Sequence, residues 1–590
     1  MTRKARSTPA RSLLAQLGSV RAQYAVSATA TKLALLAALE RTTLRRASQL
    51  ASLHAQLLFL RAFPDDGPVF EAASRGLAQF AARVRRMRPG ERVRLEDTGL
   101  AGSASRHTFE APIAGWLCQR FPTDVEIDWA NVVDADGLEV LSALAALRAE
   151  HDGLESPVGL RRWFQHARAP AEPSALAWLM RQLTLTAAGQ SVSSALYDQL
   201  KVPIIWRMRD AAGAATHNFL PVRQVAYRTG FRPAPKDPRR WIAAPLPRIR
   251  RLPRDAAVRV LDVTRAALTA RCREVFALAH ANLDEVYLAD LGEGAALAVY
   301  GVAIDQRLSL ESNYGFLLLS NGVPIGYGGV TALFRQANTG INIFESFRGS
   351  EAAFLWAQCL RAFASLFGVQ RFLISPYQIG QGNSEAIASG AFWFYYRLGF
   401  RPVDGRLGAI AAAEWKRQRA RPRYRTPAAI LRRLADDDLE LVLRSARARD
   451  RFPEAWLGQL GLRASELLAH AGGPHRAADA EIVSRRVARA LGARGRARWP
   501  SAEREAFTAL APLVGLLDLA RIDARSRSQL VTLMRTKGAP QERAYARGAA
   551  RNRHLIPGLM ALMRSPANPG QRSSALQLRE RAPQRAMRDK

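Results

Sequence analysis

The sequence predicts an α+β protein in which a central mixed sheet is flanked by mostly helical N-terminal and C-terminal regions. Apolar residues recur at helical spacing between residues 27 and 87 and again beyond residue 427. Between residues 314 and 400, short apolar runs alternate with turn signals and helical segments. A chain of 590 residues is also long enough for several domains. We expect three regions, over residues 1–250, 251–410 and 411–590.

The N-terminal region is expected to be mostly helical. Its pattern from residue 27 to 87 is broken only by the turn signal at 64–68, and further helices are expected over 138–148 and 174–186. Short strands are expected at 202–206 and 219–227. The Pro- and Arg-rich run over residues 232–254 is typical of a linker.

The central region begins with a helical pattern over residues 259–281, followed by an apolar segment at 284–290. Residues 314–319 have the composition of a buried strand, and Asn321-Gly322 directly after them is a strong hairpin signal. The returning strand, 323–331, contains three glycines, which favour a bulge or the close approach of another backbone or a ligand. These glycines are Gly326, Gly328 and Gly329.

A strand at 340–344 then leads through Arg348-Gly349-Ser350 into an apolar helix. This arrangement places free backbone N–H groups at the positive end of a helix dipole, where phosphate oxygens bind. A second strand follows at 370–375, then a short helix over 383–396. Gly399 allows the chain to reverse into a final strand.

Beyond residue 405 the alternation stops. Residues 411–425 are expected to be a charged, Pro-interrupted connector, followed by helices. The last residues, 565–590, have the composition of a disordered tail. The expected helices cover residues 427–434, 455–471, 478–491, 505–521 and 528–535.

Composition limits the class of protein. No apolar run approaches the ~20 residues needed to cross a bilayer, so a membrane span is not expected. Cys118, Cys272 and Cys359 are far apart and odd in number, which favours buried thiols over a disulfide framework or a metal site. We therefore expect a cytoplasmic protein. The Ser-, Thr-, Ala- and Arg-rich stretch before Glu40 fits either a basic leader or an organelle transit peptide.

The net charge of +35 is unevenly distributed. Only seven of the 86 basic residues are lysines, a bias that a GC-rich genome produces by itself. Residues 251–410 hold 14 basic and 13 acidic residues, whereas residues 411–590 hold 37 and 17. Catalysis and any contact with a nucleic acid or other polyanion would then be separate, the latter through the basic C-terminal region. The alternative is a solvated, Arg-rich helical surface.

In its order of hairpin, strand, Arg-Gly loop, helix, strand, Asn383 and Tyr395 before Gly399-Phe400, the stretch from about residue 285 to 405 resembles the GNAT acyltransferase superfamily. The resemblance implies a GNAT-like sheet that moves an acyl group from a coenzyme A thioester, acetyl-CoA or a longer acyl-CoA, to an amine acceptor. The acceptor's identity and the oligomeric state are not specified by the sequence.

The resemblance also implies roles for individual residues. A pyrophosphate loop would map to Arg348, Gly349, Ser350, Ala352 and Ala353, with Asn383 also at the cofactor. Glu351 departs from the family pattern, in which glycine is usual, because a carboxylate there repels a pyrophosphate. Its side chain would have to turn into solvent, or the donor would have to differ from an ordinary coenzyme A thioester.

Backbone N–H groups around Ile343 and Phe344 would polarise the thioester carbonyl. Tyr395 would protonate the departing thiolate, with Tyr396 as the alternative. Glu345 is the first candidate for the general base, followed by Glu311 and Glu385.

Two other functions remain open. An aminoacyl group carried by tRNA would explain both the basic flanks and the departure at Glu351. A non-catalytic scaffold that binds nucleic acid or an acidic partner through its basic ends is the third possibility.

Overall fold

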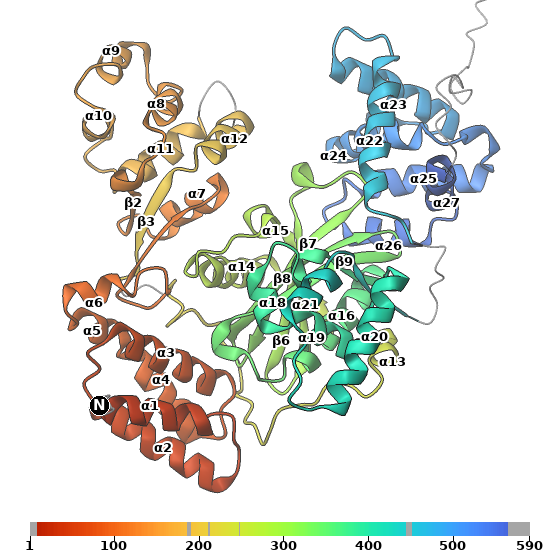
Figure 1. Cartoon of the computed structure of the whole chain (residues 1–590). Helices are drawn as coiled ribbons and strands as arrows, with labels where there is room; N and C mark the ends of the chain where they lie inside the picture. Colours follow the sequence, from red (N-terminus) through yellow and green to blue (C-terminus); the bar gives the residue numbers. More distant parts are fainter. Residues whose placement is uncertain (1–8, 186–189, 210–212, 247, 444–450, 565–590) are drawn as a thin grey trace, which may run out of the picture.

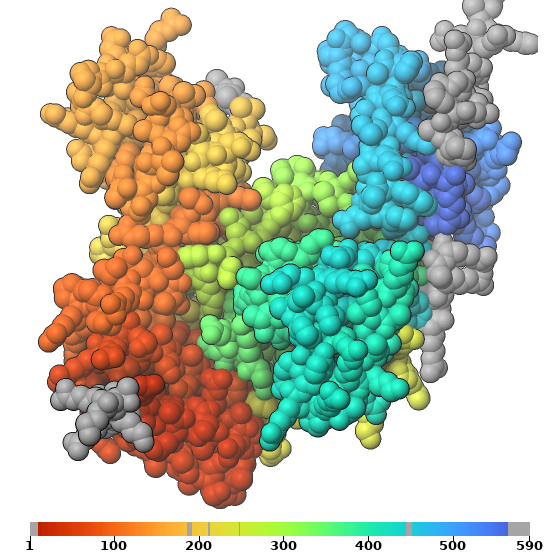
Figure 2. All heavy atoms as spheres, viewed as in Figure 1, coloured from red at the N-terminus to blue at the C-terminus, as the bar shows by residue number. Residues whose placement is uncertain are grey.

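The computed structural model describes residues 9–185, 190–209, 213–246, 248–443 and 451–564. Four parts follow one another along the chain, with the central sheet between the others (Figure 1). The first two parts, which make up the N-terminal region, lie on one side of the central part. The C-terminal helices lie on the other side (Figure 2). Of the stretch before Glu40, for which a basic leader or a transit peptide was expected, residues 1–8 lie outside the described residues, and most of the rest lies in the helices Pro9–Val20 and Val26–Arg41. The tail at 565–590 also lies outside the described residues.

The first part is helical, as the apolar spacing predicts. Most residues of helix α3 are buried, its leucines and Phe59 among them. Helix α4 begins at Asp66, whose side chain accepts from the Val69 N–H at 2.9 Å. The predicted turn at 64–68 therefore separates two helices. The elements are α1 (Pro9–Val20), α2 (Val26–Arg41), α3 (Ala47–Ala62), α4 (Gly67–Ala78), α5 (Phe80–Arg85) and α6 (Pro89–Val93).

The second part is built on a small antiparallel sheet of order β1-β3-β2. The expected strand at 202–206 is confirmed as β3, whose Trp206 is fully buried. The expected helices at 138–148 and 174–186 are present as the shorter α8 and α11. The elements are β1 (Ala104–Thr108), α7 (Ala111–Arg120), β2 (Val125–Ile127), α8 (Ala135–Ala143), α9 (His151–Leu154), α10 (Leu160–Ala167), α11 (Ala175–Leu183), α12 (Gln190–Leu200) and β3 (Pro203–Arg207).

The expectation of a strand at 219–227 is wrong. This segment is irregular and lies along the hairpin turn of the central sheet, where the Leu220 N–H donates to the Gly322 carbonyl and the Ala226 N–H donates to the Asn321 side chain. The turn residues Asn321 and Gly322 have φ of +45° and +75°, which confirms the hairpin signal. Asn321 is buried and also donates to the Ala62 carbonyl at the end of α3.

In the described part of the chain, the central sheet has nine strands in the order β11-β12-β10-β9-β8-β7-β6-β5-β4. It is mixed, because β9 and β10 are parallel and the other neighbours are antiparallel. The strands are β4 (Ile249–Arg251), β5 (Ala281–Gly292), β6 (Ala295–Val302), β7 (Ser312–Ser320), β8 (Val323–Leu333), β9 (Gln336–Ile343), β10 (Arg371–Ile374), β11 (Arg401–Pro402) and β12 (Leu439–Val442).

Helices cover both faces of this sheet. Phe316 on β7 packs against Trp356 and Phe363 of α16, while the neighbouring Leu317 belongs to the opposite core under α14 and α15. This alternation is the period of two that buries both faces of a strand. The helices are α13 (Pro238–Ala243), α14 (Arg254–Thr269), α15 (Phe276–Ala279), α16 (Ala352–Phe367), α17 (Pro376–Ile379), α18 (Ser384–Ser389), α19 (Ala391–Arg397), α20 (Gly405–Ala420) and α21 (Ala428–Leu434).

Several expectations for this part need correction. The helix expected at 259–281 ends at Thr269, and the helix expected at 383–396 is two helices separated at Gly390, whose φ is +67°. Part of the expected linker forms α13 and the edge strand β4. The expected connector at 411–425 is mostly the helix α20, begun by an Asp404 cap. Strands β6 and β12 were not expected, and β12 extends the sheet past residue 410.

The C-terminal part is a helical bundle that packs against the sheet where β7 begins and β8 ends. Its helices near 455–471, 478–491, 505–521 and 528–535 are confirmed, and the two that follow were not expected. They are α22 (Ala455–Ala469), α23 (Arg476–Leu491), α24 (Ser501–Val514), α25 (Ala524–Thr536), α26 (Arg543–Arg551) and α27 (Leu555–Arg564).

Among the helices that the structure describes, none combines the length and apolar character required to cross a bilayer. Cys118 and Cys359 are buried as expected, and burial raises the pKa of the Cys118 thiol to about 12. Cys272 differs from the expectation of a buried helical residue. It lies partly exposed in a turn with φ of +52°, within 3.2 Å of the Ser105 hydroxyl.

Candidate active site

The parallel pair β9 and β10 separates close to the predicted phosphate loop. Only Gln336, Ala337 and Asn338 of β9 are in register with β10. The strand continues for five more residues, 339–343, which pair with β8 on the other side. The loop Arg348–Ser350 and the N-terminus of α16 follow directly. The sheet therefore opens on the β10 side where β9 delivers the chain to this loop.

The backbone N–H groups of β9 that point into this opening can be identified from the register. The Phe344 N–H donates to the Ile325 carbonyl of β8 at 3.1 Å, and successive N–H groups of a strand point to opposite sides. The N–H groups of Ile341 and Ile343 therefore point away from β8. Of the two residues predicted to polarise a carbonyl, Ile343 faces the opening, whereas the Phe344 N–H is used within the sheet.

Tyr395 of α19 lies at the same opening. Its hydroxyl oxygen is 3.5 Å from the Ile341 nitrogen, which donates to it. The side chain is only 2% exposed and packs against Trp356 and Phe400. Burial raises the pKa of Tyr395 to about 12, so the hydroxyl keeps its proton at neutral pH.

Tyr396 has different surroundings from its neighbour. Its ring stacks on Phe392 and contacts Trp393 and Trp415, and the Arg401 guanidinium lies 4.0 Å from its centroid. These contacts place Tyr396 in an aromatic cluster with α20. The structure thus brings Tyr395, and not Tyr396, to the end of β9.

The loop before α16 presents exposed backbone. Arg348 and Gly349 are exposed, and Gly349 has φ of +82° with open space where a Cβ would lie. Ala352 and Ala353 form the half-buried first turn of α16, which no described residue caps with a side chain. Such a helix start leaves N–H groups for an anion. The surroundings fit a phosphate-bearing cofactor here.

Glu351 is neither exposed nor unpaired. Its carboxylate is fully buried and accepts from Arg228 at 3.0 Å and from Arg232 at 2.7 Å. The Arg232 backbone N–H donates to the same carboxylate at 3.2 Å. The expectation that Glu351 turns into solvent is therefore wrong. Two guanidinium groups from the 228–232 segment neutralise the charge that was expected to repel a pyrophosphate.

The acidic residues proposed as general bases lie in different places. Glu345 is exposed directly after β9, in the 3₁₀ turn Glu345–Phe347. Glu385 on α18 forms an ion pair with Arg348, which lowers the Glu385 pKa. Glu311 precedes β7 at the opposite end of the sheet, where Lys537 donates to its carbonyl. Only Glu345 and Glu385 lie near the loop.

Three further features of the opening were not expected. Asn383 caps α18 by accepting from the Ala386 N–H at 3.0 Å, so its side chain has a structural contact. The Gln378 side chain lies over Gly340 of β9, close enough to meet a Cβ there at 2.7 Å. Arg271 lies 4.1 Å from the Phe344 ring. No sequence spacing links residue 271 or 378 to β9, because the fold alone brings them together.

The glycines of β8 have a structural explanation. A Cβ at Gly328 would lie 2.3 Å from the Gly340 carbonyl oxygen and 2.6 Å from the Phe316 ring. A Cβ at Gly326 would lie 2.9 Å from the Asn342 carbonyl oxygen, which is also too close. Close packing of the neighbouring strand therefore accounts for Gly326 and Gly328 without a ligand.

Comparison with known proteins finds no matching family model, no matching curated protein and no matching solved structure. The described residues also contain no group of three or more His, Cys, Asp or Glu side chains that could hold a metal ion.

Proposed function

We propose that the central sheet is a GNAT-like N-acyltransferase domain that transfers an acyl group from a coenzyme A thioester to an amine. The observation that carries the proposal is the parallel β9–β10 pair, which separates after three residues beside an exposed loop and an uncapped helix N-terminus. A pantetheine-like chain would lie along β9, displacing the Tyr395 hydroxyl from the Ile341 N–H, with its diphosphate on the amides of residues 349 and 351–353, which have no partner in the turn.

The chain's own groups would act as follows. The Ile343 N–H faces the thioester carbonyl and stabilises the negative charge that develops on its oxygen. The amine nitrogen forms a bond to the carbonyl carbon while the carbon–sulfur bond breaks. Tyr395, which is protonated at neutral pH, donates a hydrogen bond to the departing sulfur. The proton lost by the amine passes to Glu345, directly or through water.

A matched pair of variants tests this arrangement. With acetyl-CoA or longer acyl-CoA and a panel of amines, release of the free thiol reports turnover. Tyr395→Phe should lower kcat about 10- to 100-fold with little change in KM, because it removes a group that acts on the leaving sulfur. Tyr396→Phe keeps the aromatic cluster and should leave both constants unchanged. Equal effects of the two variants would contradict the proposed role of Tyr395.

Binding of the donor provides an independent test. Coenzyme A at millimolar concentration should raise the melting temperature of the purified protein. Ser350→Asp, which adds a negative charge to the loop, should abolish that shift. Ser350 is half-buried and donates to the Phe347 carbonyl at 2.8 Å, so Ser350→Ala, which loses the same hydrogen bond without adding charge, is the control and should keep the shift. Absence of any shift with wild-type protein would exclude coenzyme A as donor and favour the aminoacyl-tRNA or non-catalytic alternative.

A further inference from the structure

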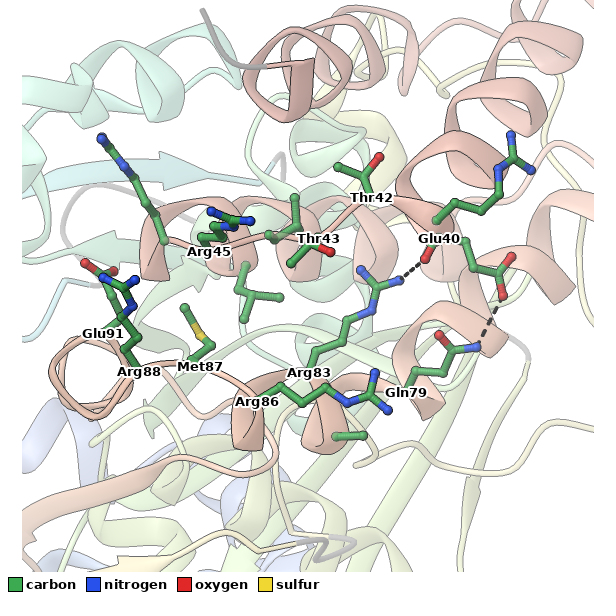
Figure 3. A pocket seen from close by; sticks show the side chains of 15 residues that line it. Glu40, Thr42, Thr43, Arg45, Gln79, Arg83, Arg86, Met87, Arg88 and Glu91 are labelled. Atoms are coloured by element: carbon green, nitrogen blue, oxygen red, sulfur yellow. Dashed lines mark hydrogen bonds between the residues drawn. The ribbon is translucent and has the colours of Figure 1, made fainter.

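An arginine-lined cavity lies in the N-terminal helical part, outside the candidate active site. It has a volume of about 790 Å³ and lies between the α2–α3 connection on one wall and the α5–α6 segment on the other. Figure 3 shows Thr43 and Arg45 on the first wall and Arg83, Arg86 and Arg88 on the second. The six arginines that line it are Arg41, Arg45, Arg46, Arg83, Arg86 and Arg88.

The carboxylates that line this cavity neutralise only part of its positive charge. Its lining includes two carboxylates, Glu40 and Glu91, against six guanidinium groups, a net charge of +4. Glu91 accepts from the Ala47 N–H at 2.7 Å, and Glu40 accepts from Gln79 at 3.2 Å. Among the described residues, none of the six arginines has a carboxylate within ion-pair distance.

One of the arginines is fixed by the helices themselves. Arg83 donates to the Leu39 and Glu40 carbonyls at the C-terminal end of α2, at 3.2 to 3.5 Å. A guanidinium that satisfies the last carbonyls of a helix also complements the helix dipole. Arg83 therefore holds the two walls together, while Arg45, Arg86 and Arg88 are exposed.

The lining indicates the chemistry of the ligand. Its larger apolar residues, Leu44, Leu50 and Met87, are each less than 10% exposed, so they offer no surface for a lipid chain. None of the described residues that line the cavity is aromatic, so they offer bases no stacking platform. What remains is several guanidinium groups, which bind phosphate oxygens in a forked geometry.

We propose that this cavity binds the phosphodiester backbone of a nucleic acid, without reading its bases. The inference is independent of acyl transfer. The cavity also lies at the start of α3, whose other end accepts a hydrogen bond from Ser320 of the central sheet. A helix of 16 residues spans about 24 Å, so a bound strand would lie within a few nucleotides of that sheet.

Fluorescence anisotropy of labelled oligouridylate, with oligothymidylate as the DNA probe, tests the proposal on the full chain. The variant Arg45→Gln/Arg86→Gln/Arg88→Gln removes three exposed charges and leaves the Arg83 contacts in place. Loss of three phosphate contacts lowers the salt-dependence slope by about 2. At about 0.1 M salt that change corresponds to a loss of affinity on the order of 100-fold.

The matched control is Arg494→Gln/Arg498→Gln/Arg525→Gln, which removes the same charge from exposed sites in the C-terminal bundle. Melting temperatures of both variants check that they fold. The control should bind as wild type does. Wild-type protein that binds neither probe, a cavity variant with unchanged affinity, or an equal loss in the control would each overturn the proposal. So would equally tight binding of polyglutamate, which would indicate an acidic protein partner instead.

Discussion

Removing Lys537 should loosen the C-terminal bundle from the central sheet, because its ammonium group neutralises a fully buried carboxylate. Lys537 is 4% exposed and pairs with Glu542, whose side chain is 0% exposed. It also donates to the Glu311 carbonyl at 2.6 Å and lies 4.2 Å from the Tyr545 ring centroid. The nearest other cation is Arg307, 3.8 Å from Glu542.

In Lys537→Met, Glu542 would remain buried with Arg307, 3.8 Å away, as its remaining cation. Breaking a buried ion pair by removing one partner costs about 3–5 kcal/mol. Since 1.36 kcal/mol corresponds to a factor of ten, the opening equilibrium at this interface should rise by roughly two to three and a half decades. The double variant Lys537→Met/Glu542→Gln should recover part of the loss, because it removes both charges of this pair.

Hydrogen exchange measures this opening locally, which avoids assuming two-state unfolding of a multi-part chain. The amides of Glu542 and Arg543 both donate to the Glu285 carboxylate at 2.8 Å, so their protection reports the interface. Arg521→Gln is the control, because it breaks an exposed pair with Asp518 and should cost less than about 1 kcal/mol. Protection of the two amides within threefold of wild type in Lys537→Met would refute the reasoning.

Three further predictions concern the central part. Gly328→Ala should cost about 1–3 kcal/mol of unfolding free energy because its Cβ would clash with the next strand. In Gly329→Ala the atom nearest to the new Cβ is 3.6 Å away, so this control should fold normally, and urea titrations compare the two variants. Burial raises the Glu285 pKa to about 7, so this group destabilises the fold increasingly as pH rises from about 4.5 to 7, and Glu285→Gln should flatten that part of the stability profile. Glu351→Gln should lower stability by about 3 kcal/mol because Arg228 loses its buried carboxylate partner and keeps the exposed Glu293, an effect that a melting temperature equal to wild type would contradict.

Local signals in the sequence predicted the elements whose conformation is set by residues close to one another in the chain. Asn321-Gly322 required the hairpin because both residues must adopt positive φ, and the apolar spacing of α3 and α16 required helices. Strand β12 could not be predicted in the same way. Its four residues, Leu439–Val442, become a strand only because β10 and β11 leave a space between them.

The candidate site shows the same limit. The resemblance noted from the sequence implied that Tyr395, Ile343 and the Arg348–Ser350 loop lie in one region. It could not show that Tyr395 rather than Tyr396 faces β9, since adjacent residues on a helix differ only in direction. Nor could it pair Glu351 with Arg228, more than a hundred residues away.

The pairing of Glu351 changes how the basic flanks bear on function. From the sequence, an acidic residue in the phosphate loop favoured a donor other than coenzyme A, and the basic C-terminal region favoured a polyanion there. In the structure, Arg228 and Arg232 neutralise Glu351, so the loop no longer argues against a diphosphate. Several C-terminal arginines also have carboxylate partners, Arg535 and Arg521 among them, whereas the six around the N-terminal cavity have none among the described residues. Local neutralisation, rather than total charge, therefore separates a structural arginine from one that is free to bind an anion.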